Sequence, residues 1–180
     1  MKDISMHVLD ILQNSTRAGA NKILIDVVED KAEDILTISI NDNGSGMDEE
    51  TLQKAINPFF TTRTTRNVGL GLSLLKQNAE RSGGRLMISS ELGKGTEVVA
   101  LFGLSNVDRP PLGDIAGAIV LTATANTDIR FVFRFKSERI DYIFDTDEIN
   151  EALDGVPINN PEIVLCLKKM VEENIGKLET

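Results

Sequence analysis

The hydrophobic pattern of the first half of the chain changes between a helical period and a strand period. Apolar residues recur every three to four positions from Ile4 to Leu12, which is typical of a helix with one buried face. The runs "KILIDVVED" and "DILTISIND" are rich in β-branched residues and indicate strands. The predicted order is a helix over 3–18, strands over 22–30 and 34–42, helices over 48–56 and 70–81, and strands over 84–91 and 96–104. We therefore expect an α+β fold, a two-layer α/β sandwich with helices on one face of a sheet.

The pattern is interrupted at "SNVDRPPLGD", residues 105–114, by paired prolines and a glycine. This stretch is the predicted boundary between a domain over 1–104 and a small α/β domain over 105–180. The second part is predicted to contain strands near 118–125, 129–136 and 139–144, then helices over 146–155 and 161–179. Two interpretations of it stay open: a docking module for a partner, or a segment that completes the core of the first part.

Capping signals mark the starts of the last two helices. Asp145, with Glu148 three residues later, is typical of a capping box. Asn160 directly precedes Pro161, an arrangement that favours a helix start. Cys166 lies in the apolar run "IVLCL" and is expected to be buried.

Composition and charge narrow the function classes. The 180 residues carry a formal charge of −9, which makes nucleic acid a poor partner because phosphate binding needs a basic surface. No apolar run approaches the roughly 20 residues that cross a bilayer, and the N-terminus lacks the pattern of a signal peptide. We therefore expect a cytoplasmic protein without membrane contact. The single cysteine fits a reducing compartment, and the single histidine, His7, argues against a Ser-His-Asp triad and is expected at the surface or in a cap.

The stretch "FFTTRTTRNVGLGLSLLK", residues 59–76, joins a polar loop to an apolar helix through two glycines. A helix start exposes unpaired N–H groups, and Gly69 and Gly71 would let a phosphate approach the backbone. Arg63 and Arg66 could add positive charge from the preceding loop. The alternative interpretation is an ordinary solvated loop, since the GxG spacing is common.

A second constellation, "NDNGSGMD", covers residues 41–48 and directly follows a predicted strand. Asp42 could accept a hydrogen bond from an exocyclic amine, which would select adenine over guanine. Gly44 and Gly46 would let a base lie against the loop, and Met47 would cover its face. The alternative is a hairpin turn, but a hairpin predicts an adjoining strand and a helix is expected here.

The third constellation is "DILQNSTRAG", residues 10–19. Asp10 and Asn14 are four residues apart, so one helical face carries both. A carboxylate with an amide one turn away could supply a general base and a Mg²⁺ ligand. The alternative is a pair of polar residues on an exposed helix face.

Taken together and in this order, these motifs resemble the ATP-binding domain of the GHKL superfamily. The similarity covers residues 4–103; "NPFFTTR" and "GLGLSLLKQNAERSGGRLMISSELGKGTEVVALF" look most like histidine kinases, and "DILQNSTRAGANKILIDV" is closer to the MutL type. The resemblance implies the Bergerat fold, a mixed and mainly antiparallel sheet covered by helices on one face. It also implies that ATP and Mg²⁺ bind between the helices and a lid.

The resemblance implies a role for each matching residue. Asn14 would bind Mg²⁺, Asp42 would bond the adenine amine, and Thr96 would support the adenine end. Residues 59–68 would form the lid. The full set of implied ATP contacts is Asn14, Asp42, Gly44, Gly46, Met47, Phe60, Thr61, Arg63, Arg66, Gly69, Leu70, Gly71, Leu72 and Thr96, with Asp10 as the catalytic carboxylate.

Two departures from the family pattern define the functional alternatives. Asp10 stands where ATP-hydrolysing relatives have a glutamate, so its carboxylate has a shorter reach. The chain also has no room for the helical hairpin that carries the phosphoacceptor of a histidine kinase. We expect either a kinase that phosphorylates a separate protein, or a module whose partner binding is gated by ATP and reset by slow hydrolysis. A third alternative is a scaffold that has lost nucleotide binding; the partner, the phosphoacceptor type and the oligomeric state stay open.

Overall fold

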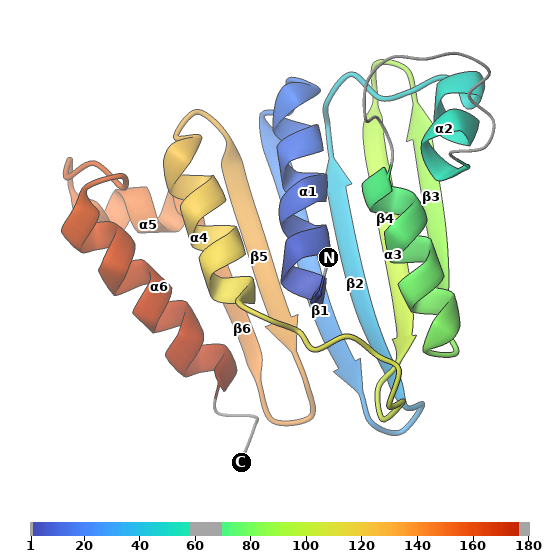
Figure 1. Ribbon diagram of the computed structural model, residues 1–180. Coiled ribbons are helices and arrows are strands. Elements are labelled where there is room, and N and C mark those ends of the chain that lie inside the picture. The colour runs from blue at the N-terminus through green and yellow to red at the C-terminus, as the bar shows by residue number, and fades with distance from the viewer. Residues whose placement is uncertain (1, 58–69, 177–180) are drawn as a thin grey trace.

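The computed structural model describes residues 2–57 and 70–176, with the side chain of Leu70 outside the described set. Figure 1 shows the arrangement of its helices and strands. In chain order these are α1 (Ile4–Arg17), β1 (Lys22–Asp30), β2 (Ile35–Asp42), α2 (Glu49–Ile56), α3 (Leu70–Arg81), β3 (Arg85–Glu91), β4 (Gly95–Gly103), α4 (Ile115–Ala125), β5 (Arg130–Lys136), β6 (Asp141–Asp145), α5 (Thr146–Leu153) and α6 (Pro161–Ile175).

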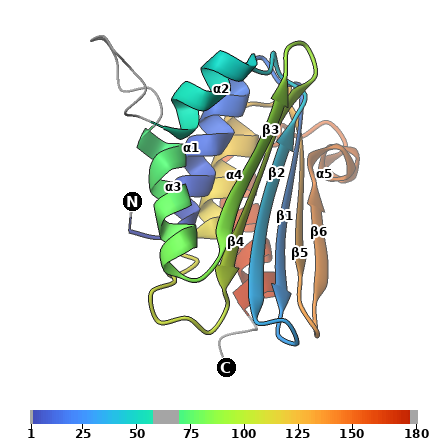
Figure 2. The ribbon, with the colours of Figure 1, turned by 90° about the vertical axis from the view of Figure 1, so that its right-hand side faces the viewer.

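The strands form one six-stranded sheet in the order β3-β4-β2-β1-β5-β6. Neighbouring strands are antiparallel except β1 and β5, which are parallel. Figure 2 shows α1, α2, α3, α4 and α6 on one side of the sheet, with α5 beside the end of β6 on the other side. The α+β prediction of helices layered on a mixed, mainly antiparallel sheet is therefore confirmed, with α5 as the exception.

The period of the apolar residues explains which faces are buried. In β1 the alternate residues Ile23, Ile25 and Val27 are fully buried, as the strand period requires. In α1 the expected apolar face is buried, and Leu12 has no exposed surface. One continuous apolar core results between the sheet and the helix layer.

The prediction of a strand near 118–125 is wrong, because these residues belong to α4. The segment is apolar on almost every side, so its sequence shows neither a helical nor a strand period and cannot discriminate between them. Asp114 caps the start of the helix, because its side chain accepts a hydrogen bond from the Gly117 backbone N–H at 2.8 Å. It is apolar all round because it packs between α1 and α6 as well as over β5.

The segment at 105–114 connects two parts of the same sheet. Strand β5 lies directly beside β1, and the buried Phe131, Phe133 and Phe135 belong to the same core as the strands of the first half. Part of the connection is also bonded to α1, where the Ile4 N–H donates to the Pro111 carbonyl at 2.9 Å. Of the two interpretations of the C-terminal part, completion of the core therefore describes its packing, and docking of a partner stays a separate hypothesis.

Details of the C-terminal helices both follow and depart from expectation. The Asn160 side chain caps α6 by accepting from the Glu162 N–H, and Asp145 caps α5 by accepting from the Asp147 N–H. Cys166 is exposed, contrary to expectation, because α6 turns Leu167 and Val171 toward the core. Among the helices that the structure describes, none is both long and apolar enough to span a bilayer.

Candidate functional site

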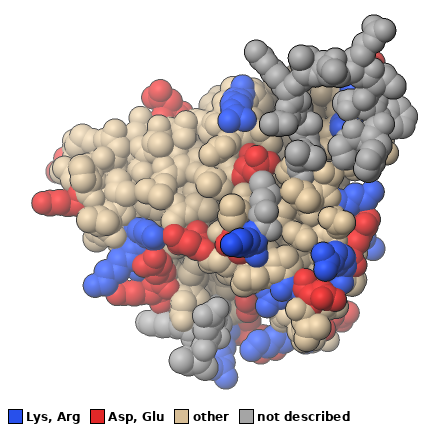
Figure 3. Space-filling model, in the orientation of Figure 1, with Lys and Arg blue, Asp and Glu red and all other residues tan. Residues whose placement is uncertain are grey.

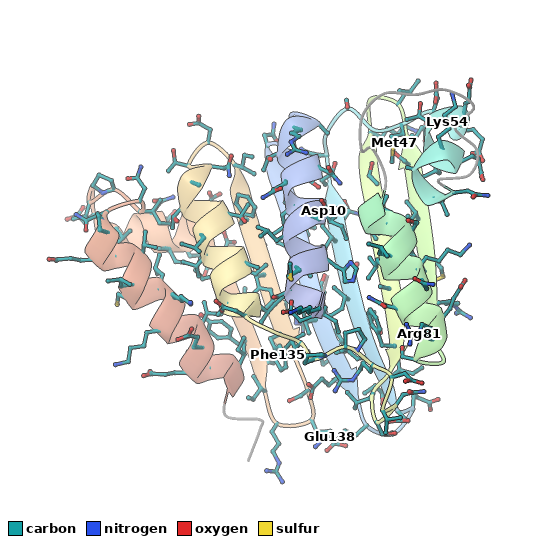
Figure 4. All side chains as sticks on the ribbon, viewed as in Figure 1. Asp10, Met47, Lys54, Arg81, Phe135 and Glu138 are labelled. Carbon is teal, nitrogen blue, oxygen red and sulfur yellow. The ribbon has the colours of Figure 1, made fainter. Side chains whose placement is uncertain are left out.

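A cavity of about 310 Å³ lies beside α1, between that helix, the loop after β2, α2, α3 and β4. Its wall includes seven of the residues singled out from the sequence: Asp10, Asn14, Asp42, Gly46, Met47, Leu72 and Thr96. Figure 4 shows Asp10 on α1 and Met47 near the end of the sheet beside α2. The structure thus brings residues from three sequence motifs to one place.

The other predicted site residues lie beside the wall, at the start of α3, or outside the described residues. Gly44 and Gly71 do not line the cavity but lie beside residues that do, Gly44 next to Asp42 and Gly71 against Asp10. Leu70 begins α3. The predicted lid residues Phe60, Thr61, Arg63 and Arg66, together with Gly69, lie outside the residues that the structure describes.

Asp42 is a buried carboxylate at the end of β2, and both of its oxygens are hydrogen-bonded. Oδ2 accepts from the Ser15 hydroxyl at 2.6 Å, and Oδ1 accepts from the Gly44 N–H at 2.9 Å. Each carboxylate oxygen has two lone pairs, so capacity for a further donor remains. The two internal bonds fix the orientation of the side chain at the cavity wall.

Two glycines allow the loop after β2 to lie against the turn between β3 and β4. Gly46 has φ +65°, and a Cβ at this position would overlap the carbonyl oxygen of Glu91. Gly95 has φ +112°, and a Cβ there would overlap the carbonyl oxygen of Asp42. Both positions need a residue without a Cβ, because the conformation and the space each exclude one.

Ser90, on β3, connects this loop to β4 through its hydroxyl. The Met47 N–H donates to Ser90 Oγ at 2.8 Å, and Ser90 Oγ donates to the Gly95 carbonyl at 3.0 Å. Thr96 Oγ1 lies 2.8 Å from the same oxygen. The cavity walls formed by Met47 and Thr96 are therefore held by one residue outside the cavity.

Another part of the cavity wall is formed by Asp10 and by Leu72 near the start of α3. The Asp10 carboxylate lies so close to Gly71 that a Cβ on Gly71 would overlap Oδ2. The first N–H groups of a helix have no partner within the helix and carry a partial positive charge. A carboxylate and the amides of a helix start therefore meet beside this part of the cavity wall.

His7 lies one turn before Asp10, and the expectation of a surface or capping histidine is wrong. The ring is almost completely buried between α1 and α3, where Nε2 lies 2.9 Å from Asn78 Nδ2. Nδ1 is buried and has no hydrogen-bond partner among the described residues. Burial lowers the pKa of His7, because the interior disfavours the charged ring.

The donor set at the cavity is compatible with a magnesium ion shared with a ligand. No group of three or more His, Cys, Asp or Glu residues able to hold a metal occurs among the described residues. Asn14 is exposed on the cavity wall one turn from Asp10, and amide and carboxylate oxygens are the ligands that Mg²⁺ prefers. Mg²⁺ usually takes few protein ligands and completes its shell with phosphate oxygens and water, which fits this sparse set.

Sequence reasoning missed several wall residues: Ile11, Ser15, Arg17, Ala18, Ser45, Ala55 and Val98. Ser15 is the most important of them, because it orients Asp42 from 27 residues away. It immediately follows Asn14, which is the only signal in the sequence that could have suggested it. Ser90 was also missed, since a serine in an edge strand is usually a solvated residue.

Comparison with known proteins relates this geometry to one family. The family described as "Histidine kinase-, DNA gyrase B-, and HSP90-like ATPase" matches residues 2–106. A protein of Shewanella frigidimarina (strain NCIMB 400), named as a candidate sensor protein, is 37% identical over 103 residues, 56% of this chain and 16% of its own length. The sensor protein SrrB of Staphylococcus aureus (strain NCTC 8325 / PS 47) is 35% identical over 104 residues, 55% of this chain and 17% of its own. The chain thus spans about a sixth of the length of these relatives.

Solved structures share the fold at low sequence identity. The N-terminal domain of a DNA repair protein has a TM-score of 0.54 and 17% identity, over 81% of this chain and 52% of that chain. The MutL ATPase domain of Aquifex aeolicus, complexed with ADP, has a TM-score of 0.52 and 14% identity, over 86% of this chain and 70% of that chain. At these identities the likeness concerns the fold alone.

Proposed function

The chain belongs to the family of histidine kinase-, DNA gyrase B- and HSP90-like ATPases, and from this premise we propose that its cavity binds Mg-ATP and directs the γ-phosphoryl group to a separate protein. The observation that carries the proposal is the buried, oriented carboxylate of Asp42 on the wall of a cavity that Asp10 and Leu72 of α3 also line.

The base would occupy the end of the cavity near Asp42. The carboxylate accepts hydrogen bonds, so it favours an exocyclic amine over a keto oxygen. Gly46 and Met47 form the adjoining wall, where an apolar side chain over a backbone without Cβ suits a flat ring. Thr96 lines the same end from β4, directly opposite Asp42 in the strand pairing.

The phosphates would lie at the start of α3. Helix-terminal N–H groups near Gly71 would donate to the phosphate oxygens, and Asn14 would offer its amide oxygen to the metal. The bound Mg²⁺ would neutralise part of the phosphate charge. Gly69 and the predicted lid residues, including Arg63 and Arg66, belong to this proposal by family resemblance only.

Asp10 would act as the proton acceptor in the transfer step. A hydroxyl or imidazole of the partner attacks the γ-phosphorus, the bond to the β,γ-bridging oxygen breaks, and ADP leaves with the electron pair. The proton of the attacking group passes to the Asp10 carboxylate, directly or through a water. The position of this carboxylate against Gly71 supports the assignment, since the γ-phosphate would lie near the same helix start.

The partner would dock on the C-terminal part of the chain. Leu121 on α4 and Leu165 on α6 are exposed, at 55% and 71% of their surface. Figure 3 shows few charged residues over the upper left of the view, where α4 and the upper part of α6 lie, in contrast to the lower part of the same view. Replacing Leu165 by Glu should weaken partner phosphorylation without changing ATP affinity, and equal phosphorylation by the variant would remove this surface from the proposal.

The test of nucleotide binding is a thermal-shift titration with Mg-ATP, because a ligand that binds only the native state raises the melting temperature. The wild-type chain should show a saturable rise, and Asp42→Asn should lose it at the same concentrations. Asp128→Asn is the matched control, since Asp128 is an exposed aspartate of a turn. If the wild-type protein shows no shift at millimolar Mg-ATP, the proposed function is wrong.

Phosphoryl transfer needs its own test. Labelled ATP is incubated with the protein and an extract of the cells that make it, and labelled proteins are separated by size. A labelled partner should appear with the wild type and disappear with Asn14→Ala and with Asp10→Asn. Absence of any partner whose labelling requires Asn14 would contradict the kinase assignment while leaving ATP binding intact.

A second candidate function is partner binding gated by ATP, with slow hydrolysis as the reset. The short Asp10 side chain favours this function. Its carboxylate lies against the backbone of α3, so nucleotide bound at that helix start could shift it even if ATP hydrolysis is slow. Its distinguishing result is an association that requires ATP and persists in Asp10→Asn. Association that is equal with and without nucleotide would exclude it.

A further inference from the structure

The hydroxyl of Ser90 has three close polar neighbours but only one hydrogen. It lies 2.8 Å from the Met47 nitrogen, 3.0 Å from the Gly95 carbonyl oxygen and 2.8 Å from Thr96 Oγ1. The Met47 N–H can only donate, and the Gly95 carbonyl can only accept. Only one assignment of the hydrogens makes all three contacts hydrogen bonds: Ser90 donates to the Gly95 carbonyl and accepts from both the Met47 N–H and the Thr96 hydroxyl.

This arrangement determines what the Thr96 hydroxyl can offer to the cavity. Its hydrogen is used on Ser90, so only its lone pairs face a ligand. The same holds for Ser15, whose hydrogen is used on Asp42 Oδ2 at 2.6 Å. Three side chains at this end of the cavity, Ser15, Asp42 and Thr96, therefore present acceptors and no donor.

We propose that Ser90, which does not line this cavity, is a specificity-determining positioning residue that makes the base end of the cavity reject a keto group. It acts through Thr96: as long as Ser90 accepts the Thr96 hydrogen, a ligand oxygen placed there meets only lone pairs. An amino group meets acceptors and binds. The inference rests on the proposed function and adds to it a reason why Asp42 alone does not set the choice of base.

The effect of removing the Ser90 hydroxyl follows from the same count of hydrogens. In Ser90→Ala the Thr96 hydroxyl has no acceptor at this position, so it can rotate and donate to a keto oxygen of the ligand. Inosine triphosphate is the appropriate probe, because it carries a keto oxygen where ATP carries the amine and keeps the ribose and the triphosphate. One neutral hydrogen bond changes affinity by about three- to tenfold, so the preference for ATP should fall by about that factor.

The experiment measures the dissociation constants of Mg-ATP and Mg-ITP by calorimetry for the full chain and its variants. The Kd for Mg-ITP divided by the Kd for Mg-ATP measures the preference for ATP. This ratio should fall in Ser90→Ala and return toward the wild-type value in Ser90→Thr, which restores the hydroxyl. Thr96→Val should also lower the ratio, because it removes the lone pairs that oppose the keto oxygen. In the Thr96→Val background, Ser90→Ala should have no further effect on the ratio.

These outcomes separate this inference from the proposed function. Wild-type protein that binds neither nucleotide overturns the proposed function and the inference together. Wild-type protein that prefers ATP, combined with a Ser90→Ala ratio equal to that of the wild type, overturns the role of Ser90 alone. If Ser90→Ala does not fold, an unchanged ratio in Thr96→Val overturns that role instead.

Discussion

The residues 2–106 and the residues 115–175 contribute to one sheet but are built in different ways. In the first region, glycines let backbones approach closely: a Cβ at Gly46, Gly84 or Gly95 would overlap a carbonyl oxygen of a neighbouring segment. In the second region, Gly155 has open space around it. Two of these close approaches, at Gly46 and Gly95, hold the loop after β2 against the turn between β3 and β4, beside the cavity, and the third joins Gly84 to β4 elsewhere.

The two regions also differ in how they use charge. Within the described part of the first region, the ion pairs join residues three or four apart along the chain. In the second, Arg130 pairs with Asp145 and Arg134 with Asp141, each at 2.6 Å between β5 and β6. The carboxylates of the first region that face the cavity, Asp10 and Asp42, take no part in an ion pair among the described residues. The ion pairs between β5 and β6 thus link neighbouring strands at the edge of the sheet, whereas those of the first region link residues close in the chain.

The largest effect should come from breaking the core of the second region. Phe133 is fully buried on β5, and Phe133→Ala should lower the free energy of unfolding by about 3–5 kcal/mol. ATP affinity per folded molecule should stay the same, because β1 lies between Phe133 on β5 and Asp42 on β2. Chemical denaturation gives the first quantity and calorimetry at a temperature where the variant is folded gives the second. A large loss of affinity would mean that the two regions are not separable.

A smaller effect, confined to the first region, should come from His7. Burial lowers its pKa in the folded state below the ordinary value of 6.5, so the unfolded chain binds the proton first as the pH falls. The contribution of neutral His7 to the free energy of unfolding is therefore fully present above pH 6.5. It decreases below that pH, by up to about 1.4 kcal/mol per pH unit, until the pKa of His7 in the folded state is reached. The free energy of unfolding, measured at equilibrium between pH 5 and 8, should depend less on pH for His7→Gln than for the wild type. Parallel curves for the two proteins would contradict the assignment.

The smallest effect should come from the ion pairs of the second region. Arg134 and Asp141 are both well exposed, so water and salt screen their attraction. Arg134→Gln should destabilise the protein far less than Phe133→Ala, and added salt should reduce even that difference. Arg85→Gln is the control, since Arg85 is an exposed arginine of the opposite edge strand. An effect of Arg134→Gln comparable to that of Phe133→Ala would show that the β5–β6 pair depends on charge rather than on its aromatic core.

The parts of this fold that the sequence predicts are those in which apolar residues recur with the period of a strand or of a helix. Strands with one buried face and helices with one apolar stripe were predicted in the right order, as in β1 and α1. Segment 118–125 was predicted as a strand because a helix enclosed on nearly all sides shows no period of its own. Exposure of Cys166 and burial of His7 were likewise missed, because the neighbours that decide them belong to other helices.

The sequence by itself determined the family, the order of most elements and the residue types at the cavity, because glycines, caps and apolar periods act over a few residues. Only the tertiary structure decided that β5 pairs with β1, that Ser15 orients Asp42, and that the hydroxyls of Ser90 and Thr96 lie within hydrogen-bond distance of each other. These contacts join residues that are distant in the chain or on different strands, and their hydrogen-bond directions follow from geometry. A linear pattern records which groups are present, whereas the direction in which each hydroxyl points depends on the partners that folding brings beside it.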